Sequence, residues 1–266
     1  MTNLDSRTPP VDADEVLAVL AAYWADPKPS RWGGGIPRCI AGSEYDQIVS
    51  EGASNPYWEI VRRLPCDAFR SRMFPGGQPE PDAYFFDVQS TDRMLTDRGH
   101  LCATFSWSIP SPGDIAWITE GLAGRGIVEP GAGGGYWAWQ LAQAGADVVA
   151  YEPEDPADNK FVTGEPWYPV LRGDHGETAR HPGRSLLLCW PSYAEPWAAW
   201  SLATYKGDQL FYAGAGVGGC CADDEFFSLL AAEWEDAGDS PAHVTFSGIH
   251  CYLTEYRRKA QPGSAR

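Results

Sequence analysis

The residues of this 266-residue chain that could do chemistry are centred on a glycine-rich turn. Glu129 precedes the turn Gly131–Gly135, and Tyr136 and Trp137 follow it. Glycine lets backbone N–H groups approach a ligand closely, and the amino end of a following helix offers more of them. Glu152 ends the next apolar stretch, where an acid can accept hydrogen bonds from ribose hydroxyls. We therefore predict a nucleoside-binding turn.

The spacing of the glycines and alanine in this turn is compatible with two nucleoside cofactors. Gly133, Gly135 and Ala138 have the spacing of a dinucleotide fingerprint, so an NAD-linked oxidoreductase is one alternative. Glu129 favours another cofactor, because a carboxylate repels a pyrophosphate and attracts a cation. S-adenosylmethionine carries an ammonium and a sulfonium group. It is the cofactor that we expect, either in an enzyme or in a non-catalytic binding module.

At these residues the chain resembles the class I S-adenosylmethionine-dependent methyltransferases. Val128–Gly135 matches their first motif of apolar residues, an acid and alternating glycines. A branch of the class is indicated, over about residues 103–258, by Trp107-Ser-Ile-Pro110, Glu129-Pro-Gly-Ala-Gly, Leu187-Leu-Cys-Trp-Pro191 and Gly248-Ile-His250. The resemblance implies a Rossmann-like sheet of seven mostly parallel strands with helices on both faces. It implies a cofactor bound by Trp107, Glu129, Gly131, Ala132, Gly133, Gly135, Tyr136, Trp137, Glu152, Cys189, Trp190 and Pro191.

Two further residues are candidates for catalysis. Tyr193 ends the segment Cys189–Tyr193, where amine-methylating members of the class carry Asp/Asn/Ser-Pro-Pro-Tyr/Phe. Trp190 and Ser192 depart from that pattern, which disfavours adenine-type amine methylation. His250 lies in the turn expected between the last two strands, where an imidazole could take a proton from the acceptor. A turn histidine bonded to backbone carbonyls is an equally good interpretation.

The acidic run Asp223–Glu225 is the one place where we considered a metal. Three adjacent acids can hold a divalent cation, but such a run more often caps a helix and complements its dipole. We therefore expect a helix cap here and no metal in the site.

The elements that must position these residues follow from the apolar pattern. Ser111 to Asp114 predicts a capping box that opens one helix, and further helices are expected over 136–144 and from about 223. Strands are expected at 126–129, 147–151, 170–172, 185–190, 209–213, 243–246 and 251–256. Ligands of such sheets sit at the carboxyl ends of the strands, which is where the candidate residues fall.

The chain divides into a tail (1–13) expected to be disordered, a largely helical cap (14–110), the cofactor-binding domain (111–258) and a second tail (259–266). Twelve tryptophans are more than one core needs, so some are expected to line a pocket. We therefore expect a small aromatic or apolar acceptor, of the kind found in specialised metabolism.

Composition indicates which kinds of partner the chain can bind. A net charge of −16 argues against clamping nucleic acid or an anionic membrane surface. No apolar run reaches the ~20 residues that span a bilayer. The seven cysteines form no CxxC pair, and residues 1–14 show no secretory pattern, so we expect free thiols and a cytoplasmic protein. The expected partner is a small-molecule substrate, and a homodimer is left open.

Overall fold

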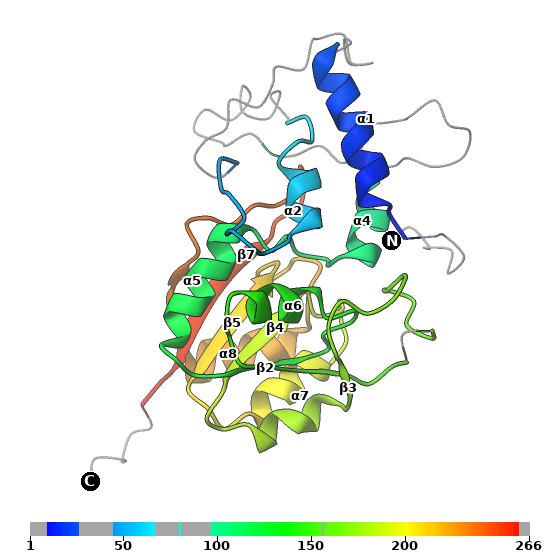
Figure 1. Cartoon of the computed structure of the whole chain (residues 1–266). Helices are drawn as coiled ribbons and strands as arrows, with labels where there is room; N and C mark the ends of the chain where they lie inside the picture. Colours follow the sequence, from blue (N-terminus) through cyan, green and yellow to red (C-terminus); the bar gives the residue numbers. More distant parts are fainter. Residues whose placement is uncertain (1–9, 27–44, 67–79, 81–96, 156, 261–266) are drawn as a thin grey trace.

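A seven-stranded sheet of order β3-β2-β1-β4-β5-β7-β6 organises the computed structural model, which describes residues 10–26, 45–66, 80, 97–155 and 157–260. The strands are β1 (Ile127–Pro130), β2 (Val148–Glu152), β3 (Leu171–Arg172), β4 (Ser185–Cys189), β5 (Gln209–Gly214), β6 (Trp234–Asp239) and β7 (Tyr252–Arg258). The first five are parallel, and β7 lies antiparallel between β5 and β6 (Figure 1). This arrangement confirms the Rossmann-like fold expected from the resemblance.

Helices cover both faces of this sheet. One face packs against α5 (Pro112–Leu122) and α6 (Tyr136–Gln143), and the other against α7 (Trp197–Thr204) and α8 (Asp224–Glu233). A short 3₁₀ helix, η1 (His175–Arg180), precedes β4. A central parallel strand is thus apolar on both sides, which explains the uninterrupted Leu186–Leu188 run of β4.

The helix caps differ in part from expectation. Ser111 Oγ accepts a hydrogen bond from the Asp114 amide at 3.1 Å, and Asp223 Oδ1 accepts one from the Phe226 amide at 2.9 Å. Asp223 is therefore the expected cap of α8. In a complete capping box the Asp114 side chain would accept a bond from the Ser111 amide. That amide donates to the Ile109 carbonyl instead, so the capping box of α5 is only half formed. The Asp114 carboxylate is bonded elsewhere.

Three helices are described in the N-terminal section: α1 (Ala13–Ala25), α2 (Pro56–Val61) and α4 (Arg98–Thr104). They lie above the sheet in Figure 1, over the edge where the parallel strands end. Expectations for residues 1–9, 27–44, 67–79 and 81–96 fall outside the described residues, as do those for 261–266. Asp12 caps α1, and the Val11 amide donates to Thr104 Oγ1 at 2.9 Å. Val11 and Asp12, which fall within the expected tail, are thus bonded to the helices that follow.

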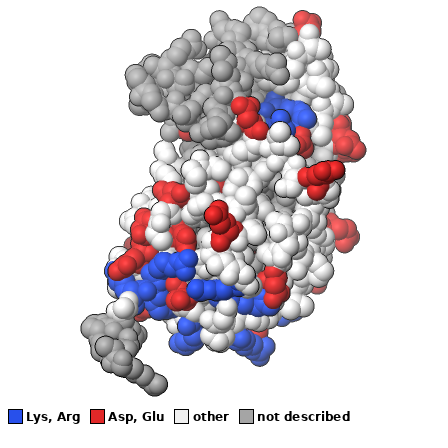
Figure 2. Space-filling view, turned by 60° about the vertical axis from the view of Figure 1, so that its left-hand side comes forward, with Lys and Arg blue, Asp and Glu red and all other residues white. Residues whose placement is uncertain are grey.

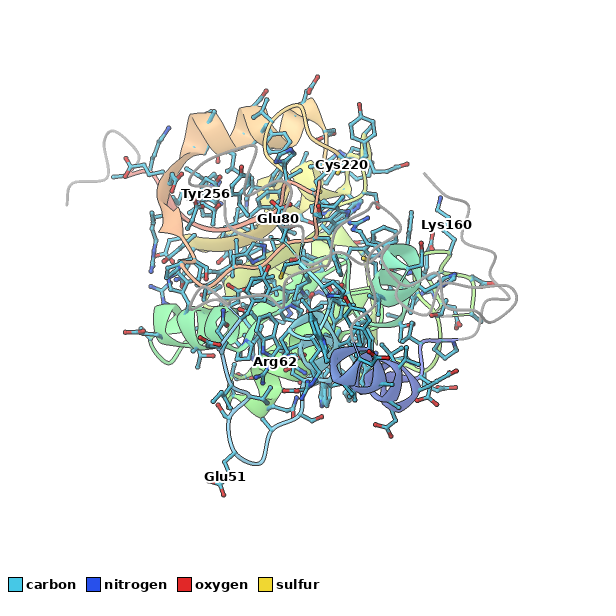
Figure 3. The ribbon with its side chains drawn as sticks, turned by 90° about the horizontal axis from the view of Figure 1, so that it is seen from above. Glu51, Arg62, Glu80, Lys160, Cys220 and Tyr256 are labelled. Carbon is cyan, nitrogen blue, oxygen red and sulfur yellow. The ribbon has the colours of Figure 1, made fainter. Side chains whose placement is uncertain are left out.

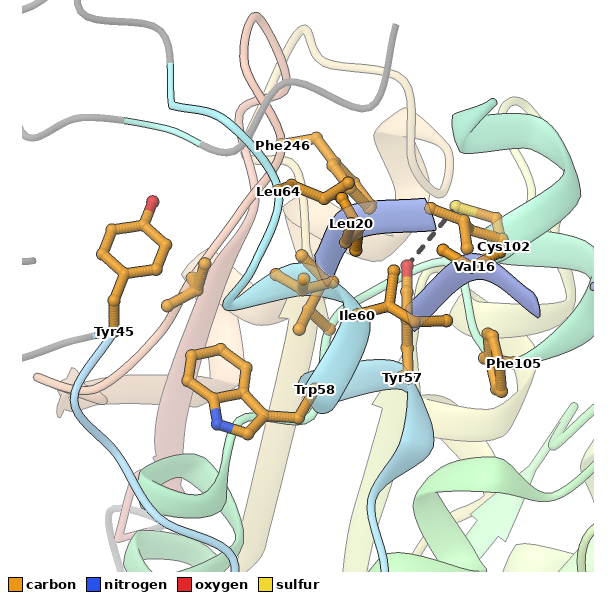
Figure 4. Packing of buried hydrophobic residues seen from close by; sticks show 14 of the residues in the cluster. Val16, Leu20, Tyr45, Tyr57, Trp58, Ile60, Leu64, Cys102, Phe105 and Phe246 are labelled. Carbon is orange, nitrogen blue, oxygen red and sulfur yellow. Dashed lines mark hydrogen bonds between the residues drawn. The ribbon is translucent and has the colours of Figure 1, made fainter. Parts of the chain in front are cut away.

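The N-terminal helices share a core with the sheet domain. Val16, Leu20 and Tyr57 are fully buried in a cluster with Phe246 of the loop before β7 (Figure 4). The same cluster contains Tyr136 of α6. Within it the Tyr57 hydroxyl lies 3.9 Å from Cys102 Sγ. The boundary expected at residue 110 therefore does not separate two cores.

One expected strand is absent from the described residues, and one strand of the sheet was not expected. The strand expected at 243–246 is a loop, and the sheet instead takes β6 directly after α8. An edge strand is held by backbone hydrogen bonds along one side, so β6 needs no alternation of apolar residues. Val244 and Phe246 do alternate, but because the loop packs into the N-terminal core.

The cysteines depart from expectation at one position. Cys66 is disulfide-bonded, so the expectation of free thiols is wrong there. This removes part of the ground for the expected cytoplasmic location. The free cysteines of the described residues are Cys102, Cys189, Cys220, Cys221 and Cys251. Within the same described residues, no helix is both long enough and apolar enough to cross a membrane.

Candidate functional site

The glycine turn joins the end of β1 to the start of α6. Gly131, Gly133 and Gly135 have φ angles of 68°, 56° and 74°, which side-chain-bearing residues adopt only at a cost. The Gly133 amide donates to Glu152 Oε2 at 2.9 Å. The turn is therefore tied to the tip of β2, and the two predicted parts of a nucleoside site lie side by side.

Glu129 is a buried acid at the end of β1. It is 2% exposed, and its Oε2 has no hydrogen-bond partner among the described residues. Burial raises the pKa of Glu129 to about 8, against the opposing effect of a hydrogen bond from the Ala138 amide. A cationic group placed beside this oxygen would satisfy it and stabilise the carboxylate.

Glu152 is a second acid with a perturbed titration. Burial raises its pKa, while hydrogen bonds from the Gly133 and Glu154 amides act in the opposite direction. Both carboxylate oxygens already accept one amide bond and retain lone pairs for ribose hydroxyls. The residues present thus fit S-adenosylmethionine: an orphan carboxylate for a cation, an acid for the ribose, and a glycine turn between them.

A segment that the periodicity did not reveal covers one side of the turn. The Trp167 amide donates to the Gly134 carbonyl at 2.8 Å. A Cβ on Gly133 would lie 3.2 Å from Val162, and one on Gly135 would lie 2.8 Å from Val170. The sequence predicted only that some tryptophans line a pocket, and it did not indicate that Trp167 lies beside the turn. The glycines are therefore required by the protein's own packing as well as by any ligand.

The cofactor contacts expected from two aromatic residues are not supported. Tyr136 and Trp137 are each 1% exposed. The Tyr136 hydroxyl donates to Asn55 Oδ1 at 2.8 Å, and Trp137 Nε1 donates to the Ser108 carbonyl at 3.3 Å. Both side chains are core residues that attach α6 to its neighbours. A residue following a glycine turn can point into the core or into the site, and its type does not decide which.

The segment after β4 is strained at Trp190. This residue has a φ of 47°, in the left-handed region that costs a bulky side chain ~1–3 kcal/mol. Backbone bonds hold it there: the Trp190 amide donates to the Ala213 carbonyl at 2.7 Å, and the Ala222 amide donates to the Pro191 carbonyl at 3.0 Å. Ala132 and Pro191, both predicted to contact the cofactor, thus lie in tightly bonded turns at neighbouring strand ends.

The ring of Trp190 is directed toward the N-terminal section. The Arg98 guanidinium lies 5.3 Å from its ring centroid and 5.5 Å from that of Trp107. Trp107 Nε1 donates to the Phe161 carbonyl at 3.3 Å. Predicted cofactor residues from distant parts of the sequence, Trp107 and Trp190, are therefore brought together around one arginine that the sequence did not single out.

Cys189 lies between the two halves of the site. Its Sγ is 3.7 Å from Ser106 Oγ. Burial, and then the charge of Glu129, raise the pKa of this thiol well above its usual range. The Cys189 side chain is therefore a neutral group near Glu129, and Ser106 is a neighbour that the sequence did not indicate.

Tyr193 and His250 lie at the same edge of the sheet. Tyr193 follows β4, and the pairing of Tyr252 with Gly214 brings the loop before β7 to the end of β5. Tyr193 is 58% exposed and His250 is also exposed. Figure 3 looks onto this side of the molecule, with Glu80, whose carboxylate accepts a bond from the Gly248 amide at 3.1 Å, near the middle. The catalytic roles of Tyr193 and His250 remain predictions.

Among the described residues, no group of three or more His, Cys, Asp or Glu side chains could hold a metal ion.

Comparison with known proteins finds only remote similarities. Neither a scan against protein-family models nor a search of curated proteins finds a match. The chain is similar to magnesium protoporphyrin IX methyltransferase from Synechocystis, crystallised with S-adenosylhomocysteine (12% identity, 65% of this chain and 90% of that one, TM-score 0.41). It is also similar to the 1,6-didemethyltoxoflavin-N1-methyltransferase from Burkholderia thailandensis (16% identity, 55% of this chain and 77% of that one, TM-score 0.36). A third similar structure is a putative RNA methyltransferase from Pyrococcus horikoshii (14% identity, 56% of this chain and 84% of that one, TM-score 0.37).

Proposed function

We propose that this chain is an S-adenosylmethionine-dependent methyltransferase acting on a small-molecule acceptor. The observation that carries the proposal is the orphan oxygen of Glu129, a buried carboxylate beside a glycine turn that Glu152 holds in place. A cationic nucleoside satisfies this oxygen, whereas the pyrophosphate of a dinucleotide would be repelled by it.

When bound, S-adenosylmethionine supplies a methyl group that is already activated by the sulfonium. The protein's part is to hold the acceptor in line with that methyl group and to exclude water. In this proposal Glu129 holds the cationic end of the cofactor and Glu152 its ribose. The turn from Gly131 to Gly135 offers its amides, and Cys189 is a neutral neighbour.

The surface beside this site favours an aromatic or apolar acceptor. Large exposed hydrophobic residues follow β4, follow β5 and begin β7, at the edge where the acceptor would enter: Tyr193 (58% exposed), Val217 (80%) and Tyr252 (51%). In this account the Tyr193 ring stacks on the acceptor, and His250 removes a proton from acceptors that need it.

The charges support a partner other than nucleic acid. Lys and Arg gather low on the face shown in Figure 2. Three arginines at the opposite edge from the site are paired with acids: Arg125 with Asp208, Arg184 with Asp147 and Arg258 with Glu233, at N–O distances of 2.5–2.8 Å. Paired guanidinium groups leave little positive charge for phosphates.

Titration calorimetry with the whole chain tests this function. S-adenosylmethionine and S-adenosylhomocysteine are expected to bind with micromolar dissociation constants, about −7 to −8 kcal/mol. Glu152→Ala should weaken binding by ~1.5–3 kcal/mol, the scale of a lost hydrogen bond to a charged group. Glu120→Ala changes an exposed acid on α5 and serves as the matched control. Binding of NADH in place of both ligands would establish the oxidoreductase alternative.

A further inference from the structure

A thiol and an imidazole of the loop that precedes β7 meet a carboxylate of α5. His243 Nδ1 lies 2.9 Å from Asp114 Oδ2, and His243 Nε2 lies 3.3 Å from Cys251 Sγ. Asp114 is 0% exposed and Cys251 is 7% exposed. The order of contacts is that of a nucleophile, a base and a group that orients the base.

The carboxylate is fixed before it meets the imidazole. Ser240 Oγ donates to Asp114 Oδ1 at 2.6 Å, which leaves Oδ2 for His243. Asp114 lies in the first turn of α5, where the helix dipole favours a negative charge. This use of the Asp114 side chain explains why the capping box of α5 is only half formed.

The imidazole is held in its protonated form. Burial lowers the pKa of His243, but Asp114 and then Cys251 outweigh burial and raise it to about 10. Three other thiols interact electrostatically with Cys251, namely Cys102, Cys189 and Cys221. Tyr212 also interacts electrostatically with Cys251, and His243 supplies a cationic group beside the sulfur.

The sulfur has two further polar neighbours. Cys251 Sγ is 3.6 Å from Ser108 Oγ and 4.0 Å from the Tyr252 carbonyl. An imidazolium 3.3 Å from a sulfur stabilises the thiolate, which is the nucleophilic form.

We propose that Cys251, His243 and Asp114 form a nucleophilic thiol centre that adds to a small α,β-unsaturated carbonyl compound. The sulfur forms a bond to the β-carbon, and the electron pair of the C=C bond moves onto the α-carbon and the carbonyl oxygen. His243 Nε2 delivers its proton to the α-carbon, which leaves a thioether and a neutral imidazole. The addition releases no leaving group and consumes no oxidant or other reactant.

This class of electrophile fits the contacts better than an acyl group does. Acyl transfer builds an oxyanion that needs N–H donors around it. In the described part of the chain, the polar neighbours of Cys251 Sγ are an imidazole, a hydroxyl and a carbonyl. Addition needs one proton donor, and His243 supplies it. The proposal does not depend on the cofactor.

Alkylation by acrylamide, followed residue by residue by mass spectrometry, tests the proposal on the native full-length chain. The internal reference is Cys220, an exposed thiol in the loop after β5 (Figure 3). At pH 6 Cys251 should react at least ~10-fold faster than Cys220, because the imidazolium that lies 3.3 Å from its sulfur favours the nucleophilic form. Its rate should change less than ~3-fold from pH 6 to 8, whereas free N-acetylcysteine, included as a model thiol, gains on the order of 100-fold.

Variants connect the rate to the imidazole. His243→Gln should lower the rate at Cys251 by at least ~10-fold at pH 6, to near the level of an unassisted thiol. His175→Gln changes a histidine that packs 4.9 Å from the Trp200 ring, and it should leave the rate unchanged. If His243→Gln does not fold, the pH profile of the wild-type chain still tests the proposal. A Cys251 that reacts no faster than Cys220 at pH 6, or only after urea is added, would overturn the proposal.

Discussion

At the scale of single residues, Glu129 makes cofactor affinity depend on pH. Its pKa is raised to about 8, so near neutral pH the free site holds a proton that a cationic ligand must displace. Affinity for S-adenosylhomocysteine, whose ammonium group remains, should therefore rise between pH 6 and 8 by up to ~10-fold per unit and then level off. Calorimetry across this range measures it, with Glu129→Gln expected to flatten the dependence. An affinity equal at pH 6 and 8 in the wild type would contradict the role given to Glu129.

His243 makes stability depend on pH in a different window. Its folded-state pKa of about 10 lies above the ordinary value of 6.5, so its contribution is complete below about pH 6.5 and is lost as the pH rises through 10. Urea unfolding should show that the wild type exceeds His243→Gln most at pH 6.5, with the difference shrinking by at most ~1.4 kcal/mol per unit above it. A difference that does not change between pH 6.5 and 9.5 would refute this coupling.

At the scale of elements, Asp223 distinguishes a helix cap from a metal ligand. Its side chain accepts the Phe226 amide at the start of α8, so Asp223→Ala should cost ~1 kcal/mol of unfolding free energy. Methyl transfer should survive EDTA, because the carboxylate is used by the helix. A strict requirement for Mg²⁺ that disappears in Asp223→Asn would instead establish a metal site.

The elements also show what the sequence could and could not predict. Local patterns were enough for the buried strands and for the glycine turn between β1 and α6, because each carries its own apolar or conformational signal. β6 was missed because an edge strand is defined by its pairing with β7. The contacts of His243 were not predicted either, because its partner Asp114 lies on α5, far away in the sequence, and no spacing connects the two residues.

At the scale of the whole molecule, the N-terminal helices and the sheet domain should unfold together. Leu20 of α1 is fully buried in a cluster that also holds Tyr136 of α6. Leu20→Ala should therefore destabilise the chain by ~2–5 kcal/mol and shift the unfolding of the sheet domain with it. Near-ultraviolet circular dichroism and fluorescence should give coincident urea transitions. Two separate transitions, with only the first shifted, would show that residues 14–110 form an independent unit.

The central claim is that the edge formed by Glu129, the glycine turn and Glu152 holds S-adenosylmethionine. A crystal structure of the chain with S-adenosylhomocysteine tests it most directly. We expect the ligand's ammonium group within about 3.5 Å of Glu129 or of a water bonded to it, and the ribose hydroxyls on Glu152. We expect its sulfur to lie toward Cys189, facing the side of Tyr193 and His250. A ligand bound elsewhere, or no ligand at the glycine turn at saturating concentration, would contradict the account.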